Sequence, residues 1–112
     1  MEFPELLEQL KTLKREEMRS QAADYFEIVV ASTEMPSLLS MLQDYFGEPL
    51  KPVGKSPSNE AQRCAKPYGG VRENQTLFYR RIGEGSVVAL IWPWGSGLSL
   101  TLKLFRENNG RP

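Results

Sequence analysis

Two tryptophans separated by one proline form the most unusual local sequence of the chain. The segment 92–97 reads Trp-Pro-Trp-Gly-Ser-Gly, so Pro93 holds an extended backbone between Trp92 and Trp94. We expect the two indoles to point apart, with one in the core and the other forming a wall of a binding site or an interface anchor. The competing interpretation is that both indoles cap the hydrophobic core, since tryptophan is highly buried on average.

The segment 67–72, Pro-Tyr-Gly-Gly-Val-Arg, is a second candidate binding element. Its adjacent glycines could form a backbone nest for an anion, with Arg72 as the counter-charge. A Gly-Gly pair is more typical of a plain tight turn, and the segment lacks the glycine-lysine pattern of phosphate-binding loops. We predict a site where this segment meets the tryptophan turn, with Trp92, Trp94, Tyr68 and Arg72 as the ligand-binding or partner-binding residues.

Residue types that support catalysis are sparse. The chain has no histidine and one cysteine, so a Cys-His pair is excluded. We interpret Cys64 as a half-buried structural thiol, although Arg63 and Lys66 nearby would lower the pKa of a reactive one. The carboxylates are scattered and suggest neither a metal site nor a cofactor. The composition therefore favours a binding protein over an enzyme.

Fourteen basic and 14 acidic residues give a net charge of +0. We therefore expect no nucleic-acid or membrane partner. Arg80, Arg81 and Lys103 beside Tyr79 could form a basic, aromatic sheet face for single strands, but we interpret them as a solvated face. The predicted partner is an unidentified protein or small molecule. A homodimer is also compatible with a chain whose charge does little to oppose self-association.

The N-terminal sequence lacks a basic segment followed by an apolar run, which is the mark of a signal peptide. No apolar run approaches the roughly 20 residues needed to cross a bilayer. A single cysteine also argues against a disulfide-stapled secreted domain. These features predict a cytoplasmic location.

We expect residues 1–112 to form a single domain organised around an antiparallel meander of strands at 76–82, 86–92 and 98–105. The last strand alternates leucine with polar residues from Leu98 to Leu104. This period of two predicts leucines that point inward, and leaves Ser99, Thr101 and Lys103 in water. The strand at 86–92 is apolar on both faces and should lie inside the sheet.

Apolar stripes at helical spacing predict helices at 4–20 and 35–46, the second ending at Gly47. Residues 24–31 read as a strand that is largely apolar on both faces, which suits an interior position. Residues 47–75 form a long Pro/Gly-rich loop with a short helix expected at 57–66, and 107–112 are expected to be a frayed tail.

The order α-β-α-(α)-β-β-β predicts an α+β fold, a two-layer sandwich of a four-stranded, mostly antiparallel sheet with helices on one face. The predicted function is that of a small soluble, non-catalytic binding or protein-interaction module. One alternative is a small enzyme without metal or histidine chemistry. The other is a structural subunit of a homo-oligomer, attached through an exposed sheet edge or through Met18 at the end of the first helix.

Overall fold

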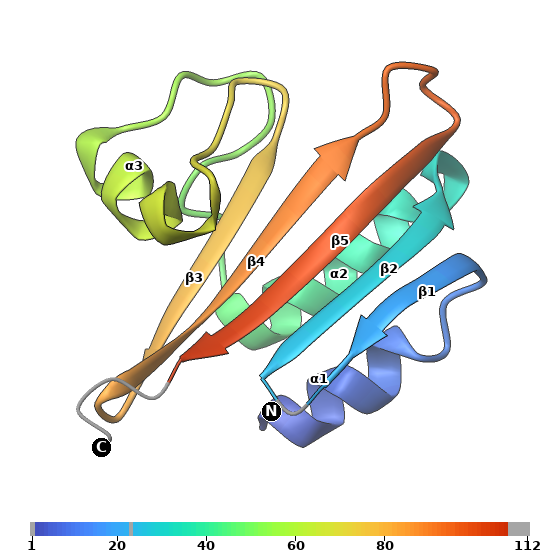
Figure 1. Cartoon of the computed structure of the whole chain (residues 1–112), viewed down its shortest axis with the longest axis horizontal. Coiled ribbons are helices and arrows are strands. Elements are labelled where there is room, and N and C mark those ends of the chain that lie inside the picture. Colours follow the sequence, from blue (N-terminus) through green and yellow to red (C-terminus); the bar gives the residue numbers. More distant parts are fainter. Residues whose placement is uncertain (1, 23, 108–112) are drawn as a thin grey trace.

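An antiparallel sheet runs through the middle of the protein (Figure 1). The computed structural model describes residues 2–22 and 24–107, and in them the sheet has five strands in the order β1-β2-β5-β4-β3. The C-terminal strand β5 is the middle strand because it pairs with β2 on one side and with β4 on the other. The strands are β1 (Arg15–Gln21), β2 (Tyr25–Ala31), β3 (Thr76–Ile82), β4 (Gly85–Pro93) and β5 (Ser99–Glu107).

Helices lie against both faces of this sheet. The two helices α1 (Phe3–Leu10) and α2 (Met35–Phe46) pack on one face, which we call the helix face and which is turned away from the viewer in Figure 1. The short helix α3 (Asn59–Ala65) packs on the opposite, outer face, over β3 and β4. Two 3₁₀ turns, η1 (Ser32–Glu34) and η2 (Lys66–Tyr68), precede α2 and follow α3.

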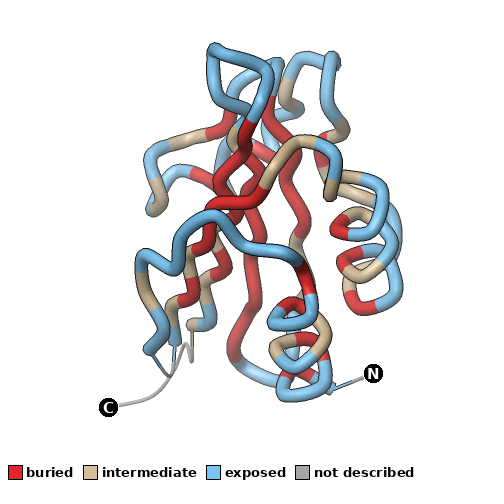
Figure 2. Tube along the Cα trace, turned by 90° about the vertical axis from the view of Figure 1, so that its right-hand side faces the viewer, coloured by how far each residue is buried: buried red, intermediate tan, exposed pale blue. Residues whose placement is uncertain are grey.

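The alternation along β5 places its leucines where the sequence predicts them. Leu100, Leu102 and Leu104 are buried on the helix face, beside residues of β2 and β4. Leu98 is the exception: it precedes the strand and is 74% exposed. The predicted helix at 35–46 and its end at Gly47 are confirmed, and Gly47 adopts a positive φ of 81°. The buried residues, red in Figure 2, gather in the central strands and on the inner sides of the helices.

The prediction of four strands was wrong because the second half of the expected helix at 4–20 is the edge strand β1. Helix α1 ends at Leu10, and the chain then turns so that Leu13 is buried from the turn rather than from another helical turn. Residues of β1 are almost all exposed, so their sequence carries no apolar alternation. Met18 therefore lies on an edge strand, 36% exposed, and not at a helix end.

The prediction that all helices lie on one face was also wrong, because the outer face has a core of its own. Ser99 and Thr101, which we expected in water, are buried. Strands β3 and β4 are apolar on both faces, so the segment between α2 and β3 folds back and covers the outer one. This second core contains Ala61, Ala65, Val71, Leu77, Val88 and Leu90.

A buried lysine fastens that segment to the sheet edge. Lys51 is 1% exposed, and its backbone exchanges hydrogen bonds with Leu77 of β3 (3.2 and 2.9 Å). Its ammonium donates to the carbonyl oxygens of Glu73 and Gln75, the latter at 2.6 Å. Burial lowers the pKa of Lys51, and the Glu73 carboxylate opposes that shift. The cation thus replaces its lost hydration with two carbonyls of the loop that enters β3.

We expect Leu102→Ala to lower the free energy of unfolding by about 3 kcal/mol, since it leaves a cavity between the sheet and α2. The matched control is Leu98→Ala, the same substitution at the exposed end of the same alternation, which should change it by less than about 0.5 kcal/mol. Urea unfolding followed by circular dichroism measures both. Similar losses in the two variants would contradict the observed placement of the leucines.

Candidate functional site

Aromatic side chains follow the outer face of β5 from one end to the other. They come from the β4 strand and the turn after it, from β2, from β5 itself and from η2, so no single segment contains them. We call this set the aromatic row; its members are Trp94, Trp92, Tyr25, Phe105 and Tyr68. Helix α3 does not cover all of it, and Trp94 is 40% exposed.

The indole of Trp94 is exposed yet held in place. Its Nε1 donates to Oγ1 of Thr101 at 2.9 Å, and its backbone N–H donates to the carbonyl of Ser99 at 2.9 Å. The guanidinium of Arg19, from β1, lies 5.6 Å from the centre of the ring. The hydrogen bond uses the polar atom of the side chain, so what remains available to a partner is the apolar ring surface.

Trp92 lies on the same face, one ladder position before the turn. It is half-buried against the outer core, and the ammonium of Lys103 sits 4.0 Å from its ring centre. Its buried Nε1 has no hydrogen-bond partner among the described residues. The expectation that the two indoles point apart was wrong, because residues i and i+2 of an extended chain share one face and Pro93 keeps the chain extended. Both indoles therefore lie beside Thr101.

At the other end of the row, three rings from three elements lie against one another. Phe105 of β5 is the middle ring, with Tyr68 stacked on it at 4.1 Å between centroids and an interplanar angle of 26°. Tyr25 of β2 also lies against Phe105, at 4.8 Å between centroids and an interplanar angle of 38°. Such offset contacts stabilise an arrangement beyond the area it buries, so these rings form a fixed surface rather than independent side chains.

Each tyrosine of this group is paired with a carboxylate. The hydroxyl of Tyr25 donates to Glu27, and that of Tyr68 donates to Glu107. Burial raises the pKa of both tyrosines well above the usual value, and the hydrogen bond to the carboxylate raises it further. Both phenols are therefore protonated donors at neutral pH, the opposite of what a tyrosine acting as a general base requires.

Two hollows flank Tyr68 on this face. The larger, of about 350 Å³, is lined by Asp24, Tyr25, Tyr68, Phe105, Arg106 and Glu107. The smaller, of about 210 Å³, lies toward α3 and includes Cys64, Tyr79 and Ser86. Tyr68 and Glu107 line both hollows, so the two hollows adjoin at these residues.

The structure places three of the four predicted site residues on the aromatic row and sets Arg72 apart from it. Arg72 is exposed in the loop before β3, and its backbone N–H donates to the side-chain oxygen of Gln75 at 2.9 Å. The glycine pair forms no anion nest. Gly69 and Gly70 donate their N–H groups to the carbonyls of Lys66 and Ala65, which ends the helical segment as a tight turn.

Other residues singled out from the sequence have structural roles here. Cys64 is half-buried, and burial together with Glu60 raises the pKa of its thiol rather than lowering it. Arg80 and Lys103 lie on opposite faces of the sheet. The Arg80 guanidinium lies on the helix face, where it donates to the backbone carbonyl of Tyr45 in α2 at 2.9 Å. Arg80 and Lys103 therefore do not belong to one basic face.

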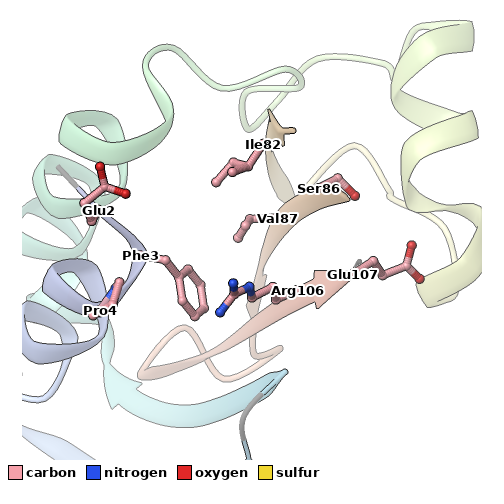
Figure 3. Close-up of a pocket in the computed structure, with 8 residues that line it drawn as sticks. All are labelled: Glu2, Phe3, Pro4, Ile82, Ser86, Val87, Arg106 and Glu107. Atoms are coloured by element: carbon pink, nitrogen blue, oxygen red, sulfur yellow. The ribbon is translucent and has the colours of Figure 1, made fainter. Parts of the chain in front are cut away.

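A further hollow, of about 150 Å³, opens beside the start of α1 (Figure 3). Its floor includes Phe3 and Val87, and the guanidinium of Arg106 lies 5.2 Å from the ring centre of Phe3. Glu2 and Glu107 stand on opposite sides of it, as Figure 3 shows. Side chains of both signs therefore line this hollow.

Three residues of the site were not among the predicted ones: Arg19, Tyr25 and Phe105. Phe105 had a usable signal, since it continues the outward series of Ser99, Thr101 and Lys103 by the same period of two. Tyr25 and Arg19 had none, because their roles depend on the pairing of β1 and β2 with each other and with β5.

Within residues 2–22 and 24–107, no three His, Cys, Asp or Glu side chains are grouped so that they could share a metal ion. Nor does that part of the chain hold a helix long and apolar enough to cross a membrane. Comparison with known proteins gives no match: no family model fits the chain, and neither curated proteins nor solved structures resemble it significantly.

We expect Tyr68→Phe to weaken the dependence of stability on alkaline pH. The folded protein holds the pKa of Tyr68 above the unfolded value of 10.0, so this group stabilises the fold below pH 10 and loses that effect as the pH rises further. Between pH 9 and pH 11 the wild type should lose about 1 kcal/mol more than the variant. Denaturant unfolding at both pH values measures this difference, and parallel losses would contradict the raised pKa that burial and the bond to Glu107 give Tyr68.

Proposed function

We propose that this chain is a non-catalytic binding module whose partner contacts the aromatic row on the outer face of the sheet. The observation that carries the proposal is the state of Trp94. The residue is 40% exposed, although the polar atom of its side chain is bonded within the fold and its backbone is fixed in the turn. Tryptophan is enriched among the residues that dominate protein interfaces.

The arrangement around Trp94 lowers the cost of binding. A side chain that is already ordered loses little conformational entropy when a partner covers it. The neighbouring Arg19 is held by Glu17 and Glu27 at 3.3 and 3.5 Å, so the rim of the surface is also ordered and polar. An apolar centre with a polar rim is the usual composition of a non-obligate interface.

The chemistry of the site favours binding over catalysis. The tyrosines of the row are held protonated and act as donors to carboxylates within the fold. The two hollows beside Tyr68 are shallow and open parts of the surface, unlike the enclosed cleft that most enzymes use to bind a substrate. A small enzyme would require a group whose shifted pKa suits proton transfer near neutral pH.

We expect Trp94→Ala to remove partner binding. The control is Ile82→Ala, which shortens an equally exposed apolar side chain (43%) at the far end of the sheet, outside the aromatic row. Full-length proteins are immobilised and the molecules retained from extracts of the source cells are quantified by mass spectrometry. Loss of an aromatic anchor commonly costs about 2 kcal/mol or more, which corresponds to an affinity weaker by about 30-fold and so to a clear loss of retained partner.

Thermal unfolding of both variants shows that any loss is not a loss of folding. Trp94→Phe provides a further check, since it retains a ring without the hydrogen bond to Thr101 and should retain most of the binding. If Trp94→Ala retains every partner that the wild type retains, or if Ile82→Ala loses them equally, the aromatic row is not the binding surface.

A further inference from the structure

The larger hollow beside Tyr68 differs from the rest of the aromatic row in its charge. Its apolar wall consists of the rings of Tyr25, Tyr68 and Phe105, and its rim carries the carboxylates of Asp24 and Glu107. The remaining charged residue at the rim is Arg106. Its guanidinium is turned toward Phe3 and the helix face, as Figure 3 shows, so it does not balance the two acids on the outer face.

We propose that this hollow binds the cationic side chain, arginine or lysine, of a partner protein. The inference rests on the proposed function and deepens it, because it names the chemistry of the partner at one end of the same surface. The faces of aromatic rings attract organic cations, and nearby carboxylates add a charge-assisted contact. The volume of about 350 Å³ belongs to an open surface hollow, which suits a side chain inserted from outside.

The neighbouring charges support a cation over an anion or a neutral group. The charge of Glu27 is offset by the cation Arg19, whereas Glu107 accepts a hydrogen bond from the neutral hydroxyl of Tyr68 and so keeps its negative charge. Arg63 lines the smaller hollow. An anionic ligand in the larger hollow would meet Asp24 and Glu107 without a facing cation, and like charges at close range oppose binding.

The position of the hollow favours a protein segment over a small ammonium compound. It lies at Phe105, four residues along β5 from Thr101, against which the indole of Trp94 is held. Four residues of a strand span roughly 13 Å, a distance that an extended segment of similar length covers. A partner that places one cationic side chain in the hollow can therefore reach the exposed tryptophan as well, whereas a small ion cannot.

The test uses the full-length protein and blocked peptides that differ at one position: Gly-Ser-Arg-Ser-Gly, the same peptide with lysine, with glutamate, and with citrulline, which has the shape of arginine without its charge. Binding is followed by NMR through the aromatic resonances of Tyr25, Tyr68 and Phe105. We expect concentration-dependent shifts of these resonances with the arginine and lysine peptides, and affinity at least fivefold weaker for the citrulline and glutamate peptides. The shifts should shrink as salt is raised.

A charge-matched pair of double variants tests the two carboxylates. Asp24→Asn with Glu107→Gln should weaken binding of the arginine peptide about fivefold. Asp44→Asn with Glu48→Gln makes the same change in net charge outside the hollow, at the end of α2 and beyond it, and should leave the affinity unchanged. Two results with the wild-type protein alone would overturn the proposal: equal shifts with all four peptides, or no shifts with either cationic peptide.

Failure of the cation site can be distinguished experimentally from failure of the proposed binding surface. Trp94→Ala should leave the binding of the short arginine peptide unchanged, because that peptide occupies only the hollow. If the cationic peptides fail to bind while Trp94→Ala still abolishes retention of natural partners, the proposed cationic group of the partner is wrong. The aromatic row is then still supported as the binding surface. If the peptides bind but Trp94→Ala retains all partners, the hollow is a cation site, and the aromatic row as a whole is not the binding surface.

Discussion

The position of β5 between β2 and β4 is the constraint on which the rest of the structure depends. A strand with neighbours on both sides has all of its backbone groups available to ladders, and its side chains divide strictly between two faces. Leu100, Leu102 and Leu104 therefore meet α1 and α2, while Thr101 and Phe105 lie on the outer face. A shift of one residue in register would exchange these two sets and destroy both surfaces.

The outer face derives its properties from being only partly covered. Helix α3 and the segment that Lys51 fastens to β3 bury the part of this face over β3 and β4. Over β2 and β5 the same face is completed by side chains that include the aromatic row, and the polar atoms of Trp94, Tyr25 and Tyr68 are bonded within the fold. A face built in this way is ordered and apolar without being closed, which is the condition for reversible contact with a partner.

Patterns that are settled within one segment could be predicted from the sequence. The stripe and glycine stop of α2 and the alternation of β5 are of this kind, as is the interior position of β4. The edge strand β1 could not be predicted, since an edge exposed on both faces has no apolar period. The sequence indicated that β2 and β4 needed cover on both sides. It could not show which segment supplies it, because the residues that α3 contributes to the outer core, Ala61, Ala65 and the half-buried Cys64, are small and form no conspicuous apolar stripe.

The candidate site, too, could be predicted only where its features lie within one segment. The two tryptophans drew attention by their spacing, but their common face and the rings that continue the row follow from strand order.

The most direct test of that order is a set of backbone contacts to Thr101, measured by through-space NMR. The account predicts contacts to both Val29 of β2 and Trp92 of β4, the two residues that face Thr101 across the ladders. Contacts to only one of them, or to a residue of another strand, would place β5 elsewhere and contradict the arrangement of both faces.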